Sequence, residues 1–120
     1  MFPRSFSKFK NKRVKLDGYT FDSIAEAKHY QHTLLPRFKA GEITHLEVHP
    51  RIKCIVDGDL ICTYIADFSC LVYEDVKGFK TDVYKLKKKL VEACYKGTKI
   101  IEISPKPYSK IKLIEEKSND

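Results

Sequence analysis

Apolar and polar residues alternate in two short runs near the start of the chain, and the pattern then changes to a helical period. Residues 13–16 and 19–21 alternate around Asp17-Gly18, a two-residue turn signal, which predicts a small hairpin. A helix is expected from about Ser23 to Lys39, where apolar side chains recur with helical spacing. Pro36 is awkward inside this helix and is expected to kink it or end it early.

Further apolar runs predict strands. Residues 46–56 are rich in β-branched side chains and lead into the turn Asp57-Gly58, so the run 60–68 is expected to return antiparallel. Residues 71–77 follow almost immediately and predict a third strand beside the second.

A second helix is expected over about 82–95, followed by a strand over 99–103. The apolar face predicted for this helix consists of Val83, Leu86, Leu90 and Cys94. Because the helix forms a crossover, the strand 99–103 should lie parallel to the strand 71–77. Residues 111–114 are expected to add an edge strand.

These elements predict an α/β fold with a mixed four-stranded central sheet flanked by helices. After the N-terminal hairpin the order is α-β-β-β-α-β. Because a chain of 120 residues is too short for two cores, we expect a single domain over residues 1–120. Within it, residues 1–12 form a basic arm and residues 104–120 an extended C-terminal tail.

The chain carries a net charge of +7, and its basic residues are concentrated in two segments. Residues 1–16 contain several lysines and arginines and no acidic residue. Residues 77–99 are rich in lysine. Two basic segments around a more neutral centre are typical of a polyanion binder, and the alternative is a basic surface kept for solubility. No apolar run is long enough to span a membrane, and no signal peptide is visible, which predicts a soluble intracellular protein.

The four cysteines and four histidines do not form a zinc-binding pattern, because no CxxC pair occurs. Three of the cysteines fall within apolar runs, where a free thiol behaves as a small buried hydrophobe. We therefore expect all four cysteines to be reduced and structural. His49, at the start of a predicted strand, is interpreted as structural rather than catalytic.

Two aspartates and a lysine occupy positions that a single site can use. Asp67 ends one predicted strand, and Asp75 and Lys77 point to the same face of the next strand because side chains alternate along a strand. Glu74 points to the opposite face unless a β-bulge intervenes. Since the two strands are expected to be neighbours, both carboxylates and the ammonium group converge.

Such a cluster suits hydrolysis of phosphodiesters. Two carboxylates can hold a hard divalent cation such as Mg²⁺, with Mn²⁺ as a substitute. A bound cation lowers the pKa of a water ligand and neutralises charge on the phosphodiester, and a nearby lysine stabilises developing negative charge.

Three segments of the chain resemble motifs of the PD-(D/E)XK nuclease superfamily. They are FDSIAE at 21–26, YIADF at 64–68 and DVKG at 75–78, and the resemblance covers residues 21–99 with a matching element order. The superfamily includes type II restriction enzymes, archaeal-type Holliday junction resolvases and endonuclease subunits of some transposons. The sequence is most similar to small phage-encoded members thought to act in recombination.

The resemblance implies a restriction-endonuclease-like fold and a specific role for each site residue. Asp67 and Asp75 would ligate Mg²⁺, Lys77 would serve the attacking water, and Glu26 would be the first-helix carboxylate that completes the site. The sequence departs from the usual motif in having Ala66 before Asp67 and Asp rather than Glu at position 75.

Each of these residues also has a purely structural interpretation. Glu26 lies three residues after Ser23, the spacing of a capping box, and this is compatible with a site role. Asp67 can bind local backbone N–H groups at a strand end. Asp75 and Lys77 can form an exposed ion pair of little energetic value.

The partner expected from this site is DNA, with no membrane and no small-molecule cofactor. The residues expected to contact it are Arg13, Lys15, Lys80, Tyr84, Lys85, Lys87 and Lys88. A solvated helix face is the alternative for the last four. Aromatic residues in the basic arm, including Phe2 and Phe6, are interpreted as part of a flexible tail rather than as a stacking surface for bases.

The leading hypothesis is a Mg²⁺-dependent DNA endonuclease of phage or mobile-element recombination and repair, with Holliday-junction or other branched-DNA resolution as one setting. Two matched cuts in a junction favour a homodimer, and the chain is short enough to favour recognition of DNA shape over base sequence. The expected location is the cytoplasm, that of the host if the protein is phage-encoded. The alternatives are a non-catalytic DNA-binding or assembly module on the same fold and an RNA-binding basic protein.

Overall fold

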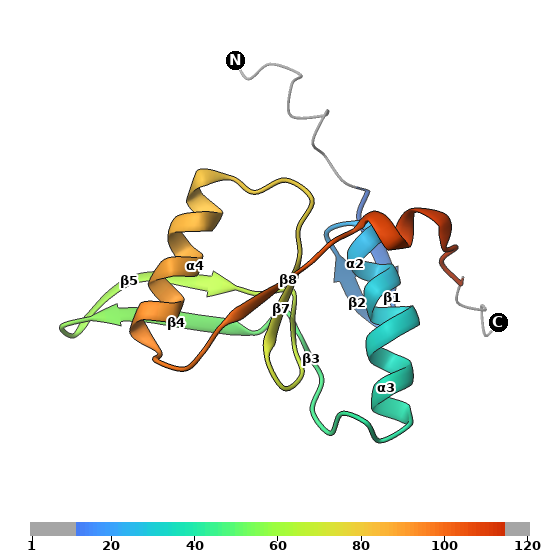
Figure 1. The fold of residues 1–120 in the computed structure, drawn as a ribbon, viewed down its shortest axis with the longest axis horizontal. Helices are drawn as coiled ribbons and strands as arrows, with labels where there is room; N and C mark the ends of the chain where they lie inside the picture. Colours follow the sequence, from blue (N-terminus) through green and yellow to red (C-terminus); the bar gives the residue numbers. More distant parts are fainter. Residues whose placement is uncertain (1–11, 115–120) are drawn as a thin grey trace, which may run out of the picture.

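A computed structural model describes residues 12–114, and Figure 1 shows the arrangement of their helices and strands. The basic arm expected over residues 1–12 lies almost entirely outside the described residues. So do the arm's Phe2 and Phe6 and the end of the predicted tail. None of the helices in the described part of the chain is both long and apolar enough to cross a membrane.

The N-terminal hairpin and the first helix form as predicted. Strands β1 (Val14–Leu16) and β2 (Tyr19–Phe21) pair antiparallel around a turn in which Asp17 and Gly18 both have positive φ. Ser23 caps the helix that follows, because its side chain accepts a hydrogen bond from the N–H of Glu26.

The first helix is continuous but changes its winding before Pro36. It runs through α2 (Ile24–His29), a π-helical segment η1 (Tyr30–Leu34) and α3 (Leu35–Lys39). Pro36 does not end the helix, so the expectation of an early end is wrong. A proline lacks the N–H for a regular helical bond and clashes with the preceding turn, and a π segment just before it changes the local bonding pattern.

The central sheet is mixed and four-stranded, but its strands differ from those predicted. It consists of β3 (Glu47–Val48), β6 (Phe68–Ser69), β7 (Tyr73–Val76) and β8 (Ile100–Ile103) in that order. The first three strands are antiparallel neighbours, and β8 pairs parallel with β7 as the crossover rule predicts.

The long strands predicted over 46–56 and 60–68 are each divided between two sheets. Strands β4 (Arg51–Val56) and β5 (Asp59–Ile65) pair with each other in a separate two-stranded sheet. The first division falls at His49 and Pro50, where His49 has a φ of 57° and Pro50 has no N–H to donate to a ladder. The second falls at Ala66 and Asp67, opposite the first.

Helix α4 (Asp82–Cys94) forms as predicted but buries a different face. Leu90 and Cys94 pack partly buried against the core as predicted, but Tyr84 and Val91 are the buried residues, and the predicted core residues Val83 and Leu86 are exposed. The Tyr84 hydroxyl donates to Glu102 at 2.9 Å, so this aromatic ring can be buried with its polar atom satisfied.

The C-terminal segment forms a 3₁₀ helix, η2 (Lys106–Lys110), and no strand is described over 111–114. Pro105 and Pro107 cannot donate to a ladder. Tyr108 is buried instead, and its hydroxyl lies 2.6 Å from His29 Nδ1, which fixes η2 against α2.

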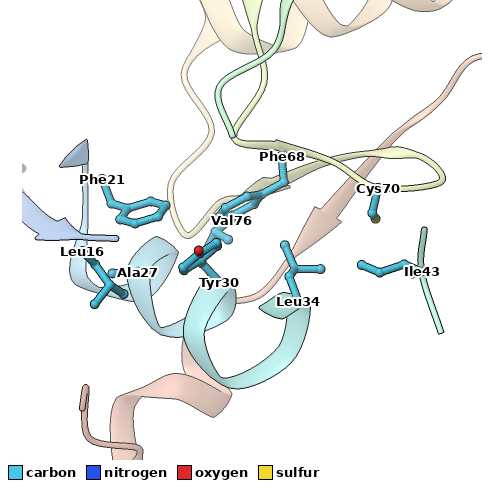
Figure 2. Packing of buried hydrophobic residues seen from close by; sticks show 9 residues of the cluster. All are labelled: Leu16, Phe21, Ala27, Tyr30, Leu34, Ile43, Phe68, Cys70 and Val76. Carbon is cyan, nitrogen blue, oxygen red and sulfur yellow. The ribbon is translucent and has the colours of Figure 1, made fainter. Parts of the chain in front are cut away.

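The central sheet lies between two hydrophobic clusters. The first joins the hairpin β1–β2, α2, η1 and the sheet, and Figure 2 shows Phe21, Tyr30 and Phe68 close together in it. The second joins β4, β5, α4 and the opposite part of the sheet, and includes Tyr64 and Val91. In Figure 1 the hairpin β4–β5 and α4 accordingly lie on one side of β7 and β8, and α2 with β1 and β2 on the other. The four cysteines are free thiols.

Candidate metal centre

Two aspartates meet where the chain leaves the hairpin β4–β5 and enters the central sheet. Asp67 lies between β5 and β6, and Asp75 lies on β7. The backbone N–H of Asp67 donates to Asp75 Oδ1 at 2.8 Å, and the N–H of Val76 donates to Asp67 Oδ2 at 2.7 Å. The structure therefore brings these two predicted site residues together, each carboxylate anchored by backbone next to the other.

Both aspartates are buried, and Asp75 is only 1% exposed. Burial raises the pKa of Asp75, and the hydrogen bond from Asp67 N–H and the Lys77 ammonium oppose that shift. Burial likewise raises the pKa of Asp67, against the hydrogen bond from Val76 N–H and the charge of Lys77. Asp75 Oδ2 makes no hydrogen bond to any described residue. A buried carboxylate oxygen without a partner is costly unless a cation compensates for it.

Glu26 combines the structural and the site interpretation. Ser23 Oγ accepts from the Glu26 N–H at 3.1 Å and donates to Glu26 Oε2 at 3.4 Å, so the side chain takes part in capping α2. Burial, with the nearby charges of Asp67 and Asp22, raises the pKa of Glu26 to about 8. Its other oxygen, Oε1, is buried and makes no hydrogen bond within the described part of the chain.

Lys77 follows β7 directly and lines the hollow together with Glu26 and Asp67. Burial is the main cause of the raised pKa of Glu26, Asp67 and Asp75. The positive charge of Lys77 lowers the pKa of each of the three and so opposes that shift. The Lys77 Nζ atom lies 4.6 Å from the centre of the Tyr84 ring. Contact with the ring face holds the ammonium group through a cation–π interaction.

Glu74 lies on the opposite face of β7, as strand alternation predicts. Its Oε1 atom lies 2.7 Å from His29 Nε2, on the side of the sheet that α2 covers. Glu74 is therefore engaged in a buried polar contact away from Asp67, and Asp75 is the acidic residue of β7 beside it.

A hollow of about 590 Å³ opens beside Glu26 and Asp67, and Asp75 is not among the residues that line it. The N-terminal turn of α2, the end of β5 and the segment after β7 line it, and its polar lining includes Asp22, Glu26, Asp67 and Lys77. Carboxylate oxygens are the ligands that hard divalent cations prefer, and Asp75 Oδ2 and Glu26 Oε1 lack protein partners. The residues present thus fit a divalent cation.

Sequence reasoning missed two residues at this site. In the described part of the chain, one group of three potential metal ligands has ligand atoms that all lie within 4.8 Å of one another. This group consists of Asp22, Glu26 and His49, and not of the predicted Glu26, Asp67 and Asp75. His49 was expected to be structural. In the sequence His49 stands next to Pro50 and Asp22 directly precedes a helix cap, but neither position by itself indicates a ligand.

A family model covers most of this chain. The model described as "Protein of unknown function (DUF1064)" matches residues 6–110. The chain belongs to the DUF1064 family. No curated protein and no solved structure matches it.

The basic residues of this DUF1064 chain differ in their availability. Lys15 and Lys85 are exposed, and Lys87 is half-buried. The other three form ion pairs: Arg13 with Asp22 at 3.4 Å, Lys80 with Glu102 at 2.8 Å and Lys88 with Glu92 at 3.0 Å.

Tyr84 requires a correction. It was expected to contact phosphate from the surface of the second helix, but its side chain is buried and its hydroxyl donates to Glu102. It supports Lys77 instead.

The buried acidic residues predict that the metal-free protein loses stability as pH rises. The pKa of Glu26 is raised from 4.5 to about 8, so the folded chain binds more protons than the unfolded chain between these values. Its free energy of unfolding then falls as pH rises through that window, and the raised pKa values of Asp67 and Asp75 act in the same direction. In EDTA we expect the Tm at about pH 8 to be roughly 5 °C or more below that at about pH 5.5.

The Glu26→Gln protein serves as the control for this melting experiment, because Gln keeps the shape and cannot ionise. Its Tm should depend less on pH, and should exceed that of the unaltered protein at about pH 8. Equal pH dependence in the two proteins would show that Glu26 is not the group responsible.

Proposed function

We propose that this DUF1064 protein is a Mg²⁺-dependent DNA endonuclease with a restriction-endonuclease-like fold and a PD-(D/E)XK type of site. The observation that carries the proposal is the pair of backbone hydrogen bonds that place Asp67 and Asp75 side by side, with Asp75 Oδ2 buried and free of hydrogen bonds to the described residues. Burying two carboxylates next to each other lowers the stability of the fold, and a bound divalent cation would offset that cost.

The side chains divide the work of hydrolysis between them. Asp67 and Asp75 would hold Mg²⁺, with Glu26 on the neighbouring helix. When bound, the cation supplies activation of water and neutralisation of the phosphodiester charge. Lys77 would orient the water and stabilise negative charge that develops on the phosphate, because it lines the same hollow and its positive charge acts on all three carboxylates.

The reaction is a simple hydrolysis. The oxygen of water forms a bond to phosphorus while one P–O ester bond breaks, and the oxygen that leaves takes up a proton to become a hydroxyl group. Water loses that proton equivalent, so the reaction consumes one water molecule and requires no further co-reactant.

DNA is the polyanion that fits this site. The chain carries a net charge of +7, and Lys80 is adjacent to Thr81, a residue that lines the hollow. Lysine and arginine bind the phosphate backbone without reading base sequence, so we expect substrate choice by DNA shape.

The test is cleavage of four-way junction, flap, nicked and linear duplex DNA in Mg²⁺ or in EDTA. We expect Mg²⁺-dependent cutting of at least one of these DNA shapes, and no cutting in EDTA. Salt-dependent binding of DNA with no cutting in Mg²⁺ or Mn²⁺ would instead identify a binding module.

A further inference from the structure

A second group of potential ligands lies at the start of helix α2 and shares Glu26 with the proposed nuclease centre: Asp22, Glu26 and His49. Asp22 directly precedes the helix cap Ser23, Glu26 lies in the first turn of α2, and His49 lies between β3 and β4. One ligand atom from each residue lies within 4.8 Å of the other two. Two pieces of local structure, the start of α2 and the turn between β3 and β4, thus converge on one point.

Two buried atoms in this group have no hydrogen-bond partner among the described residues. They are Glu26 Oε1 and His49 Nε2, and they face each other across 3.8 Å. This distance is too long for a hydrogen bond. Two atoms that bind one ion with bonds of about 2.1 Å can lie at most about 4.2 Å apart, and the 3.8 Å separation of these two atoms is within that limit.

Glu26 is itself well buried, with only 9% of its side chain exposed. Ser23 Oγ donates to Glu26 Oε2, but Oε1 has no hydrogen-bond partner among the described residues, and a buried carboxylate oxygen left in that state is costly. The exposed side chain of Asp22 is paired with Arg13 at 3.4 Å, so its carboxylate would bind an ion in exchange for that ion pair.

The backbone fixes His49 in this position at a cost in strain. Its φ of 57° is unusual for a residue other than glycine. The His49 N–H donates to the carbonyl of Asp67 at 2.9 Å, and the carbonyl of Pro50 accepts from Ala66 N–H at 3.2 Å. Strained residues held by surrounding structure are concentrated at functional sites, and here the strain places an imidazole beside Asp67.

We propose that Asp22, Glu26 and His49 form a second divalent-cation site that prefers Mn²⁺ or another first-row transition ion to Mg²⁺. Imidazole nitrogen is a good ligand for transition ions, whereas Mg²⁺ strongly prefers oxygen. The use of this ion in catalysis rests on the proposed nuclease function, since a second cation near the first would offset more phosphodiester charge. Binding of the ion itself can be measured without any DNA.

The experiment is a Mn²⁺ titration of the full chain, with free Mn²⁺ followed by electron paramagnetic resonance and bound Mn²⁺ examined by spin-echo modulation for coupling to nitrogen. The variants are Asp22→Asn, His49→Asn and Asp75→Asn. Asparagine tolerates positive φ, so His49→Asn keeps the backbone conformation. The matched control is His45→Asn, because His45 is exposed and lies outside the cluster.

We expect two bound Mn²⁺ ions and nitrogen modulation in the unaltered protein. His49→Asn should remove the modulation, and both His49→Asn and Asp22→Asn should weaken one site about tenfold or more. His45→Asn should change neither result, and excess Mg²⁺ should displace Mn²⁺ more readily from the site that Asp75→Asn removes.

The result separates the two proposals. In one outcome the unaltered protein binds a single Mn²⁺ without nitrogen modulation, Asp75→Asn loses this ion and His49→Asn keeps it. This result overturns the second site and is consistent with the proposed nuclease centre. A single Mn²⁺ lost in His49→Asn and kept in Asp75→Asn supports the second site and contradicts the nuclease centre. Absence of Mn²⁺ binding overturns both.

Discussion

Replacing Asp75 with Asn is expected to lower the rate of DNA cleavage by about a thousandfold or more while the protein stays folded. Asn preserves the size of the side chain and an oxygen that can accept from Asp67 N–H, the bond that Asp75 Oδ1 makes at 2.8 Å. It removes the charge that would hold the cation. A metal ion contributes several kcal/mol to stabilising the transition state, and each 1.4 kcal/mol corresponds to about a tenfold change in rate.

Glu74→Gln is the matched control for this variant, since Glu74 is the adjacent acidic residue on β7 and contacts His29 on the other face. Cleavage rates under single-turnover conditions and thermal unfolding curves should be measured for both variants. We expect Glu74→Gln to cut DNA at close to the original rate. If Asp75→Asn cuts as well as the unaltered protein, or if only Glu74→Gln is inactive, the assignment of the ligand on β7 is wrong.

Replacing Lys77 with Met is expected to reduce cleavage about a hundredfold or more without weakening the binding of divalent cations. Met retains most of the length of the lysine side chain and its contact with the Tyr84 ring, but it has no charge and no proton to donate. In enzymes with an oxyanion hole, loss of one donor that stabilises developing negative charge lowers the rate by about two to three orders of magnitude. We expect a comparable effect for Lys77. Removal of a positive charge that faces the carboxylates should not lower their affinity for a cation.

The measurement combines cleavage rates with Mn²⁺ binding, and Lys53→Met provides the control because Lys53 is an exposed lysine on β4. The control should change cleavage little. A Lys77→Met protein that loses Mn²⁺ binding together with cleavage would show that Lys77 maintains the structure of the site. One that cuts DNA at the original rate would exclude a role in the reaction.

Local signals in the sequence were sufficient for the elements that depend on local chemistry. The Asp17-Gly18 turn, the Ser23 cap and the crossover that makes β8 parallel to β7 all follow from turn, capping and handedness rules. The division of strands at His49-Pro50 was not predicted, because the apolar pattern continues across it. A strand that passes from one sheet to another keeps its alternation, so only tertiary structure shows the change.

The same limit explains what was found and missed at the site. Asp67 and Asp75 could be placed together because a short hairpin joins their strands, and alternation distinguished Asp75 from Glu74. His49 approaches Asp67 through the pairing of β3 with β6, two short strands far apart in the sequence. For α4, hydrophobicity favoured Val83 and Leu86, but the buried position belongs to Tyr84, whose hydroxyl has a partner in Glu102.

The central claim is that a divalent cation binds between Asp67 and Asp75, and an anomalous difference map from a crystal soaked in Mn²⁺ tests it most directly. We expect a peak within about 2.0–2.4 Å of a carboxylate oxygen of each aspartate, and its loss from crystals of the Asp75→Asn protein. A map from well-ordered crystals with no peak at these two side chains, or with Mn²⁺ bound only elsewhere, would contradict the proposed nuclease centre.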